Sequence, residues 1–230
     1  MHVHPTISRS ELLIGSSALA ALVIGVPQDS LSAAEEIHKW ALSEVTPASV
    51  LGPYYPLVNK PLNPNTDLIS IDGKARAKGP PLYLMGQVFN IKGKPVEHVE
   101  VEIWQANAAG KYAHPSDGNT APDDPSFKGY GVATTDAQGR YRFKTVVPGS
   151  YPVVPGWDRA PHVHFQVTGR LDRHVTQMWF PDHPLNSQDR LFLNLPAGAR
   201  PMVTAKLTSS SAEIEPDAKI AVFNIIVANG

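Results

Sequence analysis

Hydrophobic and polar residues alternate over several short stretches of this 230-residue chain. Between residues 99 and 104, apolar side chains alternate with two glutamates, the pattern of a strand with one buried face. Similar stretches predict strands over 83–90, 99–104, 130–135, 140–147, 162–168, 174–180, 203–208 and 220–228. Turn residues at 90–94 and 136–139 predict two hairpins. No helical period follows residue 50, so the pattern indicates an all-β fold, an antiparallel β-sandwich core with long loops.

The first 45 residues have a different pattern. A start containing Arg9, an apolar run over 12–26 and small residues at 32–34 resemble a secretory signal. The run is short for a membrane span, so no span is expected in the mature form. A helix packed on the domain is the alternative, with a cytoplasmic location. We favour export slightly and divide the chain into a signal-like segment, 1–34, and one domain, 35–230, which begins with a short amphipathic helix over 35–45.

Composition narrows the chemistry. Twenty basic and 21 acidic residues nearly cancel, which argues against nucleic acid as a partner. The chain contains no cysteine, so disulfides, thiolate metal sites and a cysteine nucleophile are excluded. Twenty-two prolines and 17 glycines suit strands joined by turns and ordered loops, and the longest loops are predicted over 56–81 and 105–128.

The segment 151–164 carries the candidate chemistry. His162 and His164 are two residues apart on a predicted strand, so both project from the same face, while the intervening apolar residues face the core. Neighbouring imidazoles backed by a core suit a metal site. Tyr151 precedes them, and a phenolate is a hard anionic ligand, which favours a hard metal.

Four motifs resemble the intradiol ring-cleavage dioxygenases, particularly the iron-bearing β chains of protocatechuate 3,4-dioxygenases. They are Trp104-Gln-Ala-Asn-Ala-Ala-Gly-Lys-Tyr112, Gly139-Arg-Tyr-Arg-Phe-Lys-Thr-Val-Val-Pro-Gly-Ser-Tyr151-Pro, Arg159-Ala-Pro-His162-Val-His164-Phe and Thr176-Gln177-Met-Trp-Phe180. The resemblance implies a β-sandwich and a non-haem Fe(III) bound by Tyr112, Tyr151, His162 and His164. It also implies that a catechol is cleaved by O2 between its hydroxylated carbons, giving a cis,cis-muconate-type diacid without an organic cofactor.

The resemblance implies further roles. Arg159 would stabilise negative charge on the substrate, and Gln177 would support that arginine. Pro53 and Tyr54, in a Gly-Pro-Tyr stretch, would line the substrate pocket. Tyr151 would leave the metal and accept a substrate proton. Val153 stands where the β chains have a tryptophan, which leaves the substrate open among protocatechuate, catechol, hydroxyquinol and substituted catechols. We lean towards a carboxylated ring, and homo-oligomerisation is left open.

Each residue also has a plainer interpretation. Tyr112 could be a surface aromatic and Tyr151 a turn residue, with both histidines on an exposed polar face. Arg159 could pair with Asp158 or another carboxylate, Gln177 could be an ordinary strand residue, and Tyr54 could pack in a rigid turn. The rival functions are therefore a non-catalytic β-sandwich binding module and a dioxygenase-like protein that holds another metal.

Overall fold

The computed structural model describes residues 44–57, 60–61, 64–210 and 215–229. Its strands are β1 (Pro81–Asn90), β2 (Glu100–Trp104), β3 (Tyr130–Thr134), β4 (Arg140–Val146), β5 (Tyr151–Val154), β6 (Trp157–Arg159), β7 (His162–Thr168), β8 (Arg173–Trp179), β9 (Thr208–Ser209), β10 (Lys219–Val222) and β11 (Ile225–Val227). Its helices are η1 (Pro184–Ser187), α2 (Arg190–Leu193) and η2 (Ala197–Val203). The signal-like segment 1–34, and all but the last two residues of the expected helix 35–45, lie outside the described residues. Within them, no helix is long and apolar enough to cross a membrane.

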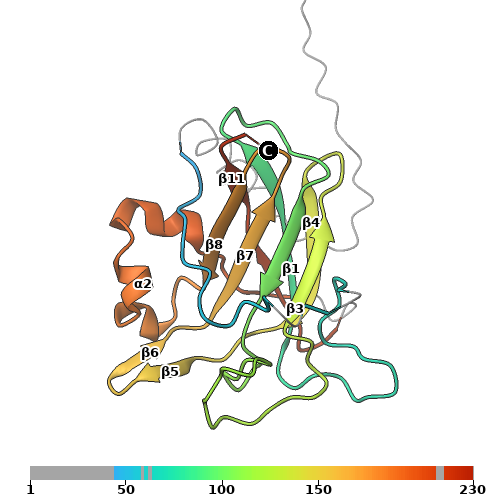
Figure 1. Cartoon of the computed structure of the whole chain (residues 1–230), viewed down its shortest axis with the longest axis vertical. Helices are drawn as coiled ribbons and strands as arrows, with labels where there is room; N and C mark the ends of the chain where they lie inside the picture. The colour runs from blue at the N-terminus through green and yellow to red at the C-terminus, as the bar shows by residue number, and fades with distance from the viewer. Residues whose placement is uncertain (1–43, 58–59, 62–63, 211–214, 230) are drawn as a thin grey trace, which may run out of the picture.

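Two sheets form the body of the molecule (Figure 1). One is antiparallel, with strand order β3-β2-β7-β8. In the other, β1 pairs antiparallel with β4 and parallel with β10 and β11 along successive stretches of its length. The sandwich is therefore built as expected from many short strands, but its second sheet is mixed, which corrects the prediction of a purely antiparallel core.

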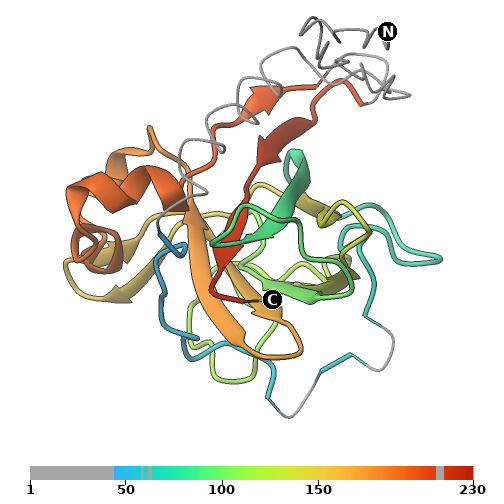
Figure 2. The ribbon, with the colours of Figure 1, turned by 90° about the horizontal axis from the view of Figure 1, so that it is seen from above.

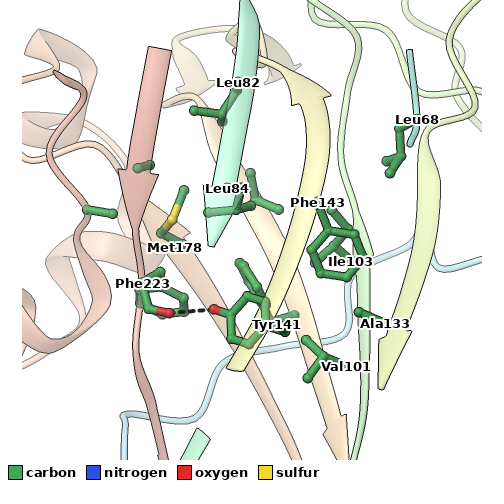
Figure 3. Packing of buried hydrophobic residues seen from close by; sticks show 14 of the residues in the cluster. Leu68, Leu82, Leu84, Val101, Ile103, Ala133, Tyr141, Phe143, Met178 and Phe223 are labelled. Carbon is green, nitrogen blue, oxygen red and sulfur yellow. Dashed lines mark hydrogen bonds between the residues drawn. The ribbon is translucent and has the colours of Figure 1, made fainter. Parts of the chain in front are cut away.

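The core lies between the two sheets (Figure 3). Leu84 of β1 and Phe143 of β4 face Ile103 of β2 across this layer, and all three are fully buried. Burial of each such side chain contributes about 1.5–3 kcal/mol. Tyr141 donates its hydroxyl hydrogen to the carbonyl of Phe223, so the one polar atom of this ring is satisfied inside the core.

Both predicted turns form, but neither joins two strands that remain paired in one sheet. At 90–94 the chain folds back over a single antiparallel bridge, Phe89 with Pro95, so this hairpin is confirmed only next to its turn. After the turn at residues 90–94, β1 and β2 enter different sheets, and after the turn at 136–139 β3 and β4 do the same. Asn90 and Asp136 still make the expected local turn bonds, since Gly93 N–H donates to Asn90 and Gly139 N–H to Asp136. A turn fixes only local backbone geometry, and packing of the apolar faces decides the partner strand.

Three further differences lie near the C-terminal half. The segment 151–161, where no strand was predicted, contains the β5–β6 hairpin. Helices η1, α2 and η2 occupy residues 184–203 and were not predicted; they lie beside β8, away from β1 (Figure 2). The predicted strand 203–208 is mostly irregular, and 220–228 is divided into β10 and β11.

Candidate metal centre

The two histidines lie on the face of the antiparallel sheet that points away from the core. On β7, Val163 and Phe165 are fully buried against the other sheet, so His162 and His164 project from the opposite face. Both histidines are nevertheless only 2% exposed. The plainer interpretation, an exposed polar face, is therefore wrong for this pair.

Two loops bring the tyrosines to the same place. Tyr112 follows β2, and the carboxylate of Asp117 accepts its backbone N–H at 2.7 Å. Gly110 packs so closely on Ser150 that a Cβ at Gly110 would lie 2.0 Å from the Ser150 carbonyl oxygen. This contact holds the Tyr112 loop against the start of β5, where Tyr151 is the first residue. Both tyrosines are buried, so neither is a surface aromatic.

The four side chains converge. His162 Nε2 and His164 Nε2 are 3.2 Å apart, and Tyr112 Oη is 3.5 Å from His162 Nε2. The Tyr151 ring centroid lies 5.4 Å from that of Tyr112 and 5.7 Å from that of His162. Two imidazole nitrogens and two phenol rings therefore surround a single small region.

Protonation in this region follows from burial. Burial lowers the pKa of both histidines well below the usual value, and the positive charge of Arg159 acts in the same direction. Both imidazoles are therefore neutral at pH 7. His162 Nδ1 lies 2.6 Å from the Ala160 carbonyl, which can only accept, so the proton is assigned to Nδ1 and the Nε2 lone pair is free. Burial raises the pKa of Tyr112 well above its usual value and also raises the pKa of Tyr151, so both are phenols before any cation binds.

This donor set fits a hard trivalent cation. Among the described residues, no group of three His, Cys, Asp or Glu side chains is close enough to hold a metal, so a metal bound at His162 and His164 would depend on the phenol oxygens. A highly charged ion stabilises phenolate over phenol and so can displace both protons. The two phenolates would then neutralise two of the three positive charges of Fe(III), and the two neutral nitrogens would complete the donor set.

Arg159 lies at the edge of this centre and is held by three groups. It pairs across the hairpin with Tyr151, its Nε–H donates to Asp189 Oδ2 at 2.8 Å, and an Nη–H donates to Gln177 Oε1 at 2.7 Å. All four residues are buried. The arginine therefore does pair with a carboxylate, Asp189 instead of Asp158, and this pairing fixes its position beside the tyrosine.

Residues 44–57, which we call the cover segment, have no regular helix or strand and lie over the same face. Gln177 Nε2 donates to the Val50 carbonyl at 3.0 Å, and Ser49 N–H donates to Val175 at 2.9 Å. Within this segment, the Tyr54 ring packs against Tyr112, with ring centroids 4.5 Å apart and ring planes inclined by 32°. Pro53 is exposed, and no described contact joins it to the other candidates.

A buried carboxylate anchors the far end of this segment. Glu102, expected on a solvated face, is only 1% exposed. Tyr55 Oη and Lys60 Nζ each donate to its Oε2 at 2.8 Å, and Gln166 Nε2 donates to its Oε1 at 2.6 Å; Tyr130 Oη is a further donor. Burial alone raises the pKa of Glu102, but the hydrogen bonds from Lys60 and the tyrosines outweigh it, and the pKa is lowered.

Sequence reasoning missed Asp189, Glu102 and the contact of Trp104 with His164. Asp189 had a local signal, because it immediately precedes the apolar run of α2 and caps that helix by accepting from Leu191 N–H and Phe192 N–H. Glu102 had none, because alternation places it on the outer face, and the groups that contact its carboxylate come from distant parts of the chain.

Comparison with known proteins gives consistent matches. A family model described as Dioxygenase matches residues 50–229. The chain is 42% identical over 143 residues to the protocatechuate 3,4-dioxygenase beta chain of Burkholderia cepacia, covering 59% of each chain. It is 30% identical over 164 residues to a catechol 1,2-dioxygenase of Candida albicans, covering 65% of this chain and 52% of that protein. The chain therefore spans about half to three-fifths of the length of these relatives.

A solved structure agrees. The dioxygenase domain of a dioxygenase carbohydrate-binding protein fusion from Streptomyces sp. SirexAA-E is 26% identical, with a TM-score of 0.60 over 81% of this chain and 100% of that chain. The 3-chlorocatechol 1,2-dioxygenase of Rhodococcus opacus 1CP, at 23% identity and a TM-score of 0.64, shares the fold.

Proposed function

This chain belongs to the intradiol ring-cleavage dioxygenase family, and from that premise we propose that it opens a catechol ring between the two hydroxylated carbons, using O2 and Fe(III). The observation that carries this proposal is the convergence of four buried donors, with His162 Nε2 3.2 Å from His164 Nε2 and 3.5 Å from Tyr112 Oη. Tyr151 completes the set. This arrangement supports an enzyme over a binding module, because nothing in binding a carbohydrate or peptide requires four buried metal-type donors.

The metal would be held by Tyr112, Tyr151, His162 and His164. When bound, it would act as a Lewis acid that favours the deprotonated catechol, whose ring is electron-rich enough to react with O2. The neutral imidazoles present lone pairs without having to lose a proton at pH 7. The phenols must each release one proton, which makes metal binding depend on pH.

The residues of the chain move protons and stabilise charge. As a phenolate, Tyr151 is a base that can accept a proton from a catechol hydroxyl. Arg159 lies opposite Tyr151 in the hairpin, and its remaining N–H donors can bind the anionic ring oxygens. The burial of all four donors keeps water from the reacting centre and strengthens these interactions.

The overall reaction balances without an added reductant. The carbon–carbon bond between the hydroxylated carbons breaks, and both atoms of O2 end in the product, one in each new carboxyl group. The two catechol oxygens supply the other oxygen of each carboxyl group. Both electron pairs needed to reduce O2 come from the ring, so neither a flavin nor a nicotinamide is required.

We propose protocatechuate, a carboxylated catechol, as the first substrate to test. The 42% identity to a protocatechuate 3,4-dioxygenase beta chain supports it. Val153, which is 44% exposed on the β5–β6 hairpin, would leave more open space beside Tyr151 than a tryptophan would. That space would admit further substituted rings, so catechol and hydroxyquinol belong in the same panel.

The test is oxygen uptake by the iron-loaded protein with these three substrates under ¹⁸O2. We expect a dicarboxylic product that carries two ¹⁸O atoms, one per carboxyl group. Tyr83→Phe is a matched control, because this tyrosine lies on β1 outside the site. An extradiol semialdehyde product, or no uptake by protein that holds iron, would refute the proposal.

Two further expectations remain proposals. We propose that residues 1–34 direct export and are removed, and that copies of the chain associate. N-terminal sequencing of protein from a fractionated producing cell tests the first, and sedimentation of the iron-loaded chain tests the second. An intact N-terminus in a soluble cytosolic fraction, or a sedimentation coefficient that fits one chain, would contradict them in turn.

A further inference from the structure

The two imidazoles of the centre are oriented by different means. A metal-bound histidine usually donates its second ring N–H to a carbonyl or carboxylate, which fixes the ring. His162 has this bond, with Nδ1 2.6 Å from the Ala160 carbonyl. Within the described residues, His164 Nδ1 makes no hydrogen bond of good geometry. The Val50 carbonyl lies close enough to favour a higher pKa of this imidazole, but the effect of burial is larger and lowers it. Something other than a strong hydrogen bond must hold this ring.

One side of the His164 ring is covered by an indole. Trp104 of β2 lies directly opposite His164 of β7 in the sheet register. Their rings are stacked, with centroids 4.9 Å apart and planes inclined by only 12°. Both residues come from central strands of the antiparallel sheet, so the backbone that carries this pair is rigid. Trp104 is itself 1% exposed and cannot swing away.

The cover segment closes on the ring at another point. Gly52 has φ +76°, and a Cβ built on it would lie 3.1 Å from His164 Cε1 and 3.7 Å from Nε2. Any side chain here would therefore push on the edge of the imidazole that carries the metal-binding nitrogen. Position 52 favours glycine for two reasons: the backbone is left-handed, and a Cβ would press against the imidazole ring.

We propose that Trp104 and Gly52 are positioning residues that hold the His164 imidazole by packing, so that its Nε2 faces His162 and the metal. This inference rests on the proposed iron centre. The stack keeps the imidazole parallel to the indole, and the Gly52 backbone limits its movement sideways along the indole face. Packing thus does for His164 what the Ala160 carbonyl does for His162.

A pair of glycine variants separates this role from backbone strain. Gly73 has φ +75°, and a Cβ there would meet no atom within 4 Å. Gly52→Ala and Gly73→Ala therefore impose the same backbone strain, but only the first contacts His164. We expect Gly52→Ala to weaken Fe(III) binding about 10–100-fold and to shift the visible tyrosinate band, as loss of a ligand-orienting contact does. Gly73→Ala should keep the affinity and band of the unmodified protein.

A metal-free measurement keeps the inference testable even where Gly52→Ala does not fold. In the NMR spectrum of the unmodified apoprotein, the ring current of Trp104 should move the His164 ring protons upfield. Trp104→Phe should keep part of this displacement, and Trp104→Leu should remove it. His164 ring protons at ordinary positions in the unmodified protein would overturn the inference.

The outcomes distinguish the inference from the proposed function. Unmodified protein that binds no Fe(III) would refute the proposed function. Unmodified protein that binds Fe(III), together with a Gly52→Ala variant of equal affinity and identical spectrum, would refute only the positioning role of Gly52 and Trp104.

Discussion

Substitution of Asp189 should destabilise the protein and misplace Arg159 at the same time. Asp189 is fully buried, and its Oδ2 accepts from Arg159 Nε, Ala160 N–H and Trp179 Nε1. Its Oδ1 caps α2. Asp189→Asn removes the negative charge but keeps an oxygen for the cap, whereas Asp189→Ala removes both.

The magnitudes follow from these contacts. The Arg159 and Asp189 side chains are 6% and 0% exposed, so solvent does not screen the pair. Removing one partner of such a buried pair costs about 3–5 kcal/mol, and we expect Asp189→Asn near the lower end. Asp189→Ala should cost about 1 kcal/mol more, because the helix cap is lost as well. Arg159→Met combined with Asp189→Asn should cost less than the sum of the single changes, because no buried charge is then left unpaired.

Urea unfolding of the apoprotein at pH 7 measures these free energies. Asp182→Asn, an exposed aspartate close in sequence, is the control for the change in net charge and should alter stability by less than about 0.5 kcal/mol. In the iron-loaded enzyme, Asp189→Asn should lower kcat more than it raises KM, because Arg159 acts on charge that develops during the reaction. A loss of stability below about 1 kcal/mol, or additive effects in the double variant, would show that the pair is not the buried anchor described above.

Three further predictions concern pH and hydrogen bonding. The pKa of Glu102 is lowered in the folded state, so this carboxylate stabilises the fold above its unfolded pKa, and the contribution is lost as pH falls through the folded pKa. In urea unfolding, the free energy of unfolding should therefore fall more steeply below about pH 4.5 in the unmodified protein than in Glu102→Gln. Burial keeps Tyr112 and Tyr151 protonated without metal, so Fe(III) binding should release two protons. The Fe(III) affinity should therefore rise by up to about 100-fold per pH unit between pH 6 and 8, as measured by chelator competition with a correction for protonation of the chelator. Gln177→Leu removes the acceptor for an Arg159 Nη–H and the donor to the Val50 carbonyl, so it should lower the free energy of unfolding by about 1.5–3 kcal/mol and also lower kcat. An unchanged midpoint in urea unfolding would show that these hydrogen bonds do not stabilise the protein.

The sequence was most informative where one strand has two distinct faces. The strand 162–168 was predicted with its observed bounds, because alternating apolar residues specify both the strand and the side from which His162 and His164 project. Strands β1 to β4 were predicted to within two residues at their ends. These features depend on local periodicity, which a single sequence displays directly.

The sequence was least informative where distant segments meet. Whether β3 pairs with β4 or with β2 depends on which arrangement buries both apolar faces, and no turn residue encodes this choice. The parallel pairing of β1 with β10 and β11 joins residues more than a hundred positions apart. Tyr55 reaches the Glu102 carboxylate because the cover segment lies over it, and Arg159 meets Asp189 because helix α2 begins beside β6.

Resonance Raman spectroscopy of the Fe(III)-loaded protein, excited in its visible band, tests most directly whether two phenol and two imidazole side chains share one ferric ion. We expect tyrosinate ring vibrations from two distinct ligands, with one set lost in Tyr112→Phe, the other lost in Tyr151→Phe, and both retained in Tyr83→Phe. A spectrum without tyrosinate vibrations, or one that neither ligand variant changes, would contradict this expectation.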